Sequence, residues 1–159
     1  MKIKSLFYAL FFGLIIVTFF LFSIMLNNYL ALPILSNPFL VFLGLIQFLI
    51  GLSVHLASIY FFKRIGKGTP VPIEPPKKLV YAGLFKYVRN PMYLAIFADI
   101  LGGFFIFGHL LLFVYAIVFF TFIHLFVVFV EEPKLKERFG KEYEEYTKSV
   151  PRWIPKIAL

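Results

Sequence analysis

Two groups of polar residues in the second half of the chain could do chemistry. Arg89 comes directly before Asn90 and Pro91, residue types typical of the N-cap and the first position of a helix. A cation at a helix N-terminus favours binding of a carboxylate or a phosphate. Glu131 and Glu132 end the last long apolar run, and a carboxylate there could accept hydrogen bonds from ribose hydroxyls or balance an ammonium ion. The simpler alternatives are an ordinary helix start and a charge pair that ends a membrane span.

Three further ionisable residues lie within or beside apolar segments. Asp99 is the one acid expected well inside a bilayer, so it is either a functional group or a protonated structural one. His124 precedes Glu131 by about two helical turns and could share a pocket with it. His109 is expected at a solvated turn. No two histidines are three to five residues apart, so we expect no helix-borne metal site.

The elements that must position these residues are membrane helices. No charged side chain occurs from Ser5 to Phe62, and all 16 lysines and arginines fall in three windows outside the apolar runs. A charge in hydrocarbon costs several kcal/mol, so such clean runs are expected where lipid is the solvent. With no cysteine, disulfide and thiolate chemistry are excluded.

The sequence predicts an all-α integral membrane bundle of four transmembrane helices in one domain. A span needs roughly 20 helical residues, and the expected spans cover about residues 6–26, 39–62, 93–107 and 110–130. A cytoplasmic loop (63–92) and a cytoplasmic tail (131–159) complete the chain. Four crossings place both termini on the side that holds the positive charge, which is the cytoplasmic side. This distribution accounts for the net charge of +8 without nucleic acid as a partner.

The second expected span carries a face of small and polar residues. Gly44, Gln47, Gly51, His55 and Ser58 are three or four residues apart and share one side of a helix. We interpret this face as a stripe for helix packing, with ligand binding as the alternative.

The two cytoplasmic segments differ in character. Glycines and four prolines between Lys63 and Lys78 predict a stiff, extended loop. The tail predicts one amphipathic helix from Glu131 to Lys148, which can lie on the membrane or fold back over a pocket. Its apolar face consists of Leu135, Phe139, Tyr143 and Tyr146, at spacings of four, four and three. Trp153, between two prolines, is expected to anchor the tail at the interface.

The order of these segments is similar to a known pattern. GLFKYVRNPMY, an apolar hairpin and then EEPKLKERFGKEYEEYTKSVPRWIP resemble the isoprenylcysteine carboxyl methyltransferase family and its phospholipid methyltransferase relatives. The resemblance covers residues 68–155 and implies S-adenosylmethionine as cofactor, bound at the cytoplasmic helix ends. It implies that the cofactor is bound by Leu79, Val80, Phe85, Asn90, Pro91, Met92, Tyr93 and Glu131.

Two departures from that pattern bear on the substrate. Asn90 stands where prenylcysteine enzymes often have a histidine, and Val127 where they have an arginine for the substrate. The resemblance therefore supports the methyl donor better than it supports a prenylcysteine acceptor. The expected substrate is a lipid-soluble or prenylated molecule that carries a carboxylate, amine or thiol. For an amine, His124 and Asp99 are the candidate bases, and Arg89 is the third catalytic candidate.

Two other functions remain open from the sequence. A non-enzymatic membrane transport or assembly protein would line a path across the bilayer with polar groups, and Gln47, His55 and Asp99 are compatible with one. A reductase would need a nicotinamide, but the chain has no glycine-rich dinucleotide fingerprint.

Overall fold

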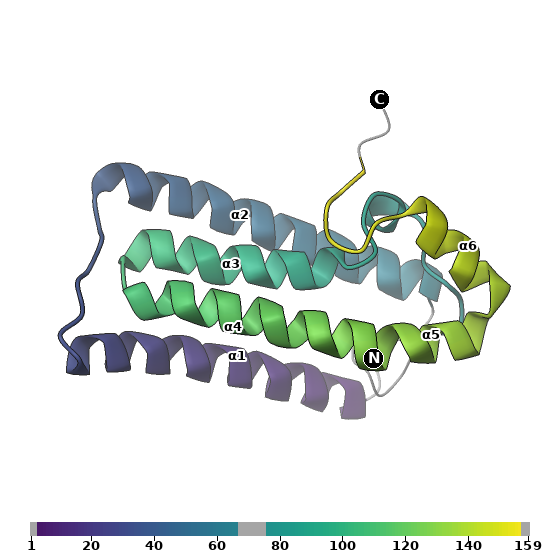
Figure 1. Cartoon of the computed structure of the whole chain (residues 1–159), viewed down its shortest axis with the longest axis horizontal. Helices are drawn as coiled ribbons and strands as arrows, with labels where there is room; N and C mark the ends of the chain where they lie inside the picture. Colours follow the sequence, from purple (N-terminus) through teal and green to yellow (C-terminus); the bar gives the residue numbers. More distant parts are fainter. Residues whose placement is uncertain (1–2, 67–75, 157–159) are drawn as a thin grey trace. The chain divides into compact units, whose positions relative to one another are not determined.

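A computed structural model describes residues 3–66 and 76–156, with side chains from residue 7 onward. In this part of the chain every regular element is helical (Figure 1), which confirms the predicted all-α class. The helices are α1 (Ile3–Tyr29), α2 (Pro38–Phe61), α3 (Pro91–Phe107), α4 (Leu110–Phe126), α5 (Glu132–Phe139) and α6 (Lys141–Ser149). A π-helical turn, Phe62–Gly66, extends α2, and a second, Val127–Glu131, joins α4 to α5. A short 3₁₀ turn spans Gly83–Lys86.

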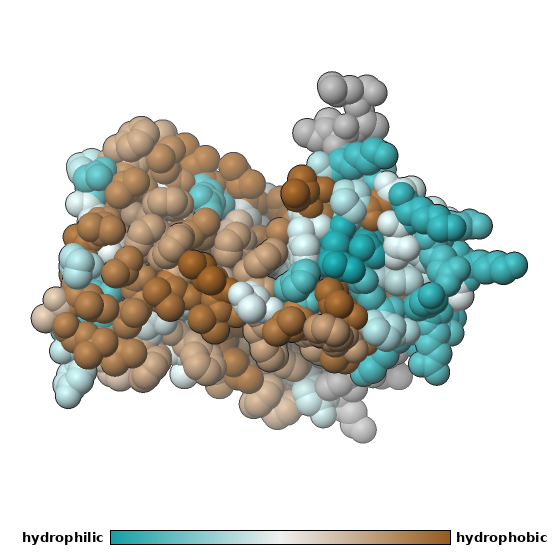
Figure 2. Space-filling view, viewed as in Figure 1, coloured by the Kyte–Doolittle hydropathy of each residue, from teal (hydrophilic) through white to brown (hydrophobic). Residues whose placement is uncertain are grey.

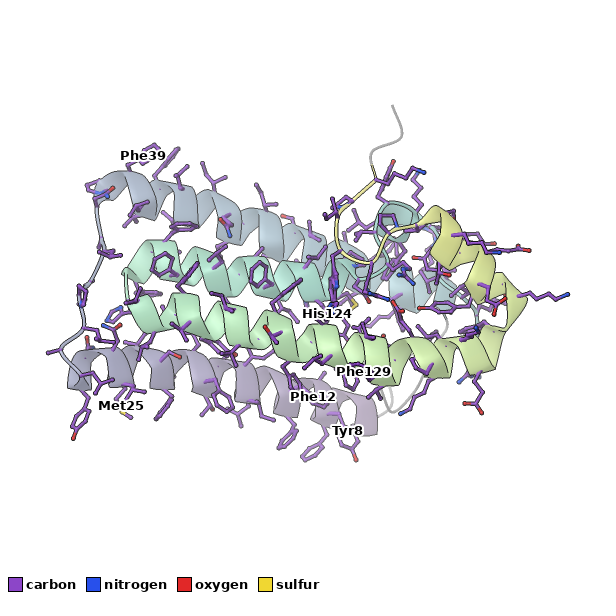
Figure 3. The ribbon with its side chains drawn as sticks, in the orientation of Figure 1. Tyr8, Phe12, Met25, Phe39, His124 and Phe129 are labelled. Carbon is purple, nitrogen blue, oxygen red and sulfur yellow. The ribbon has the colours of Figure 1, made fainter. Side chains whose placement is uncertain are left out.

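Three helical segments of the described chain are long and apolar enough to cross a membrane. They are Phe7–Tyr29, Pro38–Gly66 and Leu110–Phe139, with mean hydropathies of 2.7, 2.2 and 2.7. Side chains such as Phe12 and Met25 project from α1 (Figure 3) and are 46% and 63% exposed, as lipid-facing groups would be. The 17-residue α3 is shorter, so a fourth crossing stays a prediction. Most of the proline-rich loop, residues 67–75, lies outside the described residues.

The chain forms two compact units, and the first comprises Met1–Ser53 and Ala95–Thr121. Here three residues of the α2 stripe, Gly44, Gln47 and Gly51, pack against α3, as predicted. A methyl group on Gly44 would lie only 2.8 Å from the carbonyl oxygen of Gly102, and Nε2 of Gln47 donates to the carbonyl of Ala98 at 3.2 Å. A side chain on Gly51 would collide with Oδ1 of Asp99. The absence of side chains at these glycines therefore permits the close approach of two helices.

The turn between α3 and α4 belongs to the same unit and differs from expectation. His109 was expected to be solvated, but it is 9% exposed, and its Nε2 lies 3.1 Å from Oδ1 of Asn28. The fully buried Asn27 accepts a hydrogen bond from the backbone N–H of Leu111 through Oδ1. The end of α1 thus provides a partner for the backbone of this turn and for Nε2 of His109, as burial of polar groups requires. Nδ1 of His109 is buried without a hydrogen-bond partner among the described residues.

The second unit comprises Val54–Leu94 and Phe122–Leu159 and contains the tail. The prediction of one continuous tail helix is wrong, because Gly140 separates α5 from α6. Its φ of +51° lies in the left-handed region that side chains disfavour. The hydrophilic side chains of α5 and α6 gather on their outer surface (Figure 2). On the inner face, a core of Leu79, Tyr143, Tyr146 and Val150 is flanked by Leu135 and Phe139.

Candidate functional site

A cavity lined by both charged and apolar side chains lies in the second unit, where the ends of several helices meet the tail. Both π-helical turns contribute to its wall, a geometry that is frequent at functional sites. Its free volume is about 80 Å³, smaller than typical ligand pockets. A ligand the size of a nucleoside would therefore require the walls to part. The lining residues are Phe62, Pro76, Leu79, Val80, Phe85, Arg89, Asn90, Val127, Glu131, Glu132, Leu135, Tyr143 and Tyr146.

Glu131 is the last residue of the π-helical turn Val127–Glu131 and faces this cavity. Its Oε2 accepts a hydrogen bond of 2.8 Å from the hydroxyl of Tyr93, in the first turn of α3. Among the described residues Glu131 has no cationic partner. A partly buried carboxylate with only a neutral donor is a strong candidate for contact with a positively charged ligand.

Glu132 has the opposite environment, because two arginines hold it. Nε and Nη2 of Arg152 contact its two oxygens at 2.7 and 2.8 Å, which is a bidentate geometry. Nη1 of Arg89 lies 3.1 Å from Oε1 of the same carboxylate. The side chains of Arg89 and Glu132 are only 10% and 17% exposed. The two neighbouring glutamates therefore differ in role, since one is neutralised and the other is not.

Arg89 keeps one donor unused. Its Nε is buried and has no hydrogen-bond partner among the described residues, although Nη1 is engaged by Glu132. A buried unpaired donor on a charged group is costly unless a ligand satisfies it. Arg89 is therefore a candidate contact for an anionic group in the cavity that it lines.

The residues from Val150 to Lys156, here called the C-terminal strap, are tied across the start of α3. Three hydrogen bonds hold the strap there, and each involves a backbone atom of the strap. The N–H of Arg89 donates to the carbonyl of Pro151 at 2.9 Å, and Nδ2 of Asn90 donates to that of Arg152 at 3.2 Å. The N–H of Lys156 donates to the carbonyl of Tyr87 at 2.9 Å. Together with the Arg152 ion pair, these bonds fasten the strap to three residues that line the cavity, Arg89, Asn90 and Glu132.

The strap also engages α4. Nε1 of Trp153 donates to Nδ1 of His124 at 2.9 Å. Indole has a donor and no acceptor, so this contact requires Nδ1 of His124 to be unprotonated. The pairing gives His124 a structural role, and His124 does not line the cavity.

Two tyrosines of α6 close the cavity from the tail side. Burial raises the pKa of Tyr143 to about 12 and also raises the pKa of Tyr146. Both phenols therefore remain protonated donors at neutral pH. The hydroxyl of Tyr146 donates to the carbonyl of Phe85 at 2.6 Å, which fixes α6 against the 3₁₀ turn.

The residues proposed from the sequence fall into three groups in the structure. Five of the cofactor candidates line the cavity together with Arg89: Leu79, Val80, Phe85, Asn90 and Glu131. Pro91 begins α3 as expected and is buried. It lies outside the lining with Met92 and Tyr93, and the hydroxyl of Tyr93 is directed at Glu131. Asp99 belongs to the first unit and, like His124, is absent from the lining.

Sequence reasoning did not single out several residues of this region. Tyr143, Tyr146 and Leu135 were assigned to the apolar face of the tail but not to the cavity that this face covers. Arg152 received no role, and neither did Phe62 or Pro76. The sequence shows only that Arg152 follows Pro151, just beyond the amphipathic tail, and this does not identify Glu132 as its partner.

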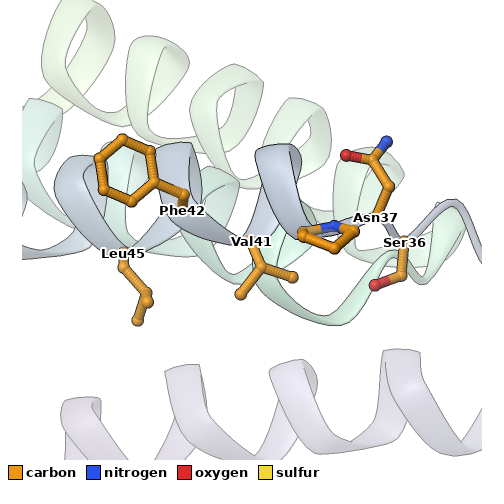
Figure 4. Close-up of a pocket in the computed structure, with 6 residues that line it drawn as sticks. Ser36, Asn37, Val41, Phe42 and Leu45 are labelled. Atoms are coloured by element: carbon orange, nitrogen blue, oxygen red, sulfur yellow. The ribbon is translucent and has the colours of Figure 1, made fainter.

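A second hollow lies in the first unit, at the start of α2 (Figure 4). It is open and largely apolar, and Ser36 and Asn37 are its polar residues. Oδ1 of Asn37 already caps α2 by accepting a hydrogen bond from the N–H of Leu40 at 3.0 Å. This hollow therefore offers little chemistry.

The long apolar helices define a multi-pass membrane protein. Its candidate site is the cavity that lies at the helix ends, against the folded tail, and that contains charged residues. The sequence model of the phospholipid methyltransferase family matches residues 39–142, more than half of the chain. The chain therefore belongs to this family and is a membrane methyltransferase that acts on a lipid-type substrate. Methyltransferases of this kind generally use S-adenosylmethionine. A comparison with curated proteins found no match.

Proposed function

We propose that the chain transfers a methyl group from S-adenosylmethionine to a lipid-soluble acceptor at the cytoplasmic face of the membrane. The observation that carries this proposal is the environment of Glu131. This carboxylate lines the cavity and accepts a hydrogen bond from Tyr93, and no cation among the described residues neutralises it. The sulfonium and ammonium groups of the cofactor would supply that charge.

The carboxylate of the cofactor has a candidate partner in the same cavity. S-adenosylmethionine also carries a carboxylate, and the buried Nε of Arg89 is an unused charged donor. Leu79, Val80 and Phe85 offer an apolar wall on which an adenine ring could pack. The donor set thus matches the charges of the cofactor, with an anion at Glu131 and a cation at Arg89.

The protein's part in the reaction is alignment and exclusion of water. Bound S-adenosylmethionine would supply an activated methyl group from its sulfonium sulfur to the acceptor and would leave as S-adenosylhomocysteine. Glu131 and Arg89 would hold the reacting groups in line. The strap and the tyrosines of α6 would keep water from the site.

The residues that line the cavity bear on the choice of acceptor. The described cavity lining contains no histidine or lysine, and His124 is engaged by Trp153. A carboxylate or thiolate acceptor, such as a prenylcysteine-type carboxylate, needs no base at neutral pH. A lipid amine would have to lose its proton before it attacks, with Glu131 or Glu132 as the carboxylates within the cavity.

The proposal is tested by ligand binding and by methyl transfer. S-adenosylmethionine should protect the purified protein against thermal unfolding, and labelled methyl should enter a lipid extract. Glu131→Gln should lose both effects, because it removes the charge that faces the cofactor. Glu137→Gln, a change of the same kind at an exposed position of α5, is the matched control. Full activity in Glu131→Gln would refute the cofactor assignment, and a wild-type protein without any response to the cofactor would favour a transport or assembly function.

A further inference from the structure

Glu132 is shared unequally between two arginines. Arg152 binds both oxygens of this carboxylate, whereas Arg89 contacts only Oε1. Two arginines and one glutamate leave one net positive charge in this cluster. If Arg152 were absent, Arg89 and Glu132 would form a neutral pair. The positive charge at Arg89 thus depends on a residue of the C-terminal strap that does not line the cavity itself.

The contact between Arg152 and Glu132 also affects which donors of Arg89 are engaged. Because Arg152 occupies both oxygens of Glu132, Arg89 reaches this carboxylate through one terminal nitrogen. Its Nε stays buried and unpaired among the described residues. An arginine without a competitor tends to bind a carboxylate through two donors. Arg152 therefore prevents Glu132 from taking the second donor of Arg89.

We infer that Arg152 is a positioning residue that keeps Arg89 available for the carboxylate end of the cofactor. The inference rests on the proposed function and adds to it a residue that acts through Glu132. It predicts that the strap affects recognition of one chemical group, the ligand carboxylate. A strap that only closed the cavity would affect all ligands alike.

The test compares two ligands that differ in that group alone. S-adenosylhomocysteine carries the carboxylate, and decarboxylated S-adenosylhomocysteine retains the amine and the nucleoside but lacks it. Both have an uncharged sulfur, so the sulfonium does not contribute. Binding to the purified full-length protein is measured by calorimetry and by protection against thermal unfolding, without any need for turnover. Arg138→Gln, which removes one exposed arginine from α5, is the matched control.

In wild type, S-adenosylhomocysteine should bind more tightly than the decarboxylated ligand. Arg152→Gln should weaken binding of S-adenosylhomocysteine roughly tenfold, as expected for loss of one charged hydrogen-bond arrangement, and leave the decarboxylated ligand unchanged. The double variant Arg152→Gln with Glu132→Gln should recover the preference, because Arg89 then stands without a competing carboxylate. Arg138→Gln should match wild type.

Other results would overturn the inference in distinguishable ways. Equal weakening of both ligands in Arg152→Gln would mean that Arg152 only fastens the strap. A double variant that binds more weakly than Arg152→Gln would have the same meaning. A wild-type protein that binds neither ligand would overturn the proposed function, and the inference with it.

Discussion

The hydroxyl of Tyr93 donates a hydrogen bond to Oε2 of Glu131 across 2.8 Å, which joins the first turn of α3 to the π-helical turn that follows α4. The bond orients the carboxylate proposed to face the methyl donor. The two residues lie far apart in the sequence, so the site depends on the packing of these two helix ends.

Replacing Tyr93 by phenylalanine removes this donor and keeps the ring. A hydrogen bond to a charged group contributes about 1.5–3 kcal/mol, so Tyr93→Phe should weaken binding of S-adenosylmethionine by about tenfold or more. Calorimetry with the purified protein measures the effect. Tyr81→Phe changes an exposed tyrosine in the same way and should bind normally. Unaltered affinity in Tyr93→Phe would show that Glu131 needs no such orientation.

Gly51 permits the close approach of α2 and α3. A methyl group there would meet Oδ1 of Asp99 and lie 3.1 Å from the carbonyl oxygen of Ala95. Gly51→Ala should therefore lower the thermal unfolding temperature in detergent, because the two helices must separate or Asp99 must move.

Gly13 is the matched control for that substitution. It lies in α1, and nothing is within 4 Å of the position of an added methyl group. Gly13→Ala should be neutral or slightly stabilising, since alanine is the better helix former by about 1 kcal/mol. Equal melting temperatures for the two variants would contradict the packing role of Gly51.

The tail core should weaken in alkaline solution. Burial raises the pKa of Tyr143 from 10.0 to about 12, so the unfolded chain releases this proton more readily than the folded one. The stability contributed by the neutral phenol is complete below pH 10 and is lost as the pH rises through 12. The melting temperature should therefore fall in this interval, and Tyr143→Phe should show a smaller fall. An identical alkaline slope in both proteins would exclude this origin.

The number of crossings can be measured directly, because the chain has no cysteine and each introduced thiol is then unique. If α3 crosses the membrane, Ser5→Cys and Lys141→Cys should react with an impermeant reagent from the same side, and Ser36→Cys from the other. Because segments rich in lysine and arginine remain on the cytoplasmic side, positions 5 and 141 are expected in the cytoplasm. Labelling of Ser5→Cys and Lys141→Cys from opposite sides would show that the membrane is crossed three times.

The long helices could be predicted because hydrocarbon sets their length and excludes charge. The starts of α2 and α3 at Pro38 and Pro91 follow from a proline directly after an asparagine, a local signal that depends little on tertiary contacts. The apolar face of the tail was also visible, since Tyr143 and Tyr146 do lie in its core.

Features that depend on tertiary contact were missed. The break at Gly140 was hidden because the apolar spacing continues across it, so the pattern fits one helix or two. His109 was placed in solvent because nothing local reveals that the end of α1 reaches it. Arg152 acts on Glu132 through a return of the chain that no periodicity encodes.

The strap is held largely through main-chain atoms, at the carbonyls of Pro151 and Arg152 and the N–H of Lys156. Main-chain hydrogen bonds depend on the number of residues between the anchors more than on which side chains those residues carry. Substitutions in the strap at positions other than Arg152 and Trp153, whose side chains contact Glu132 and His124, should therefore be tolerated. Deletion of a single residue between positions 151 and 156 would instead move every later anchor out of register. The length of this segment should therefore be more constrained than the identity of most of its side chains.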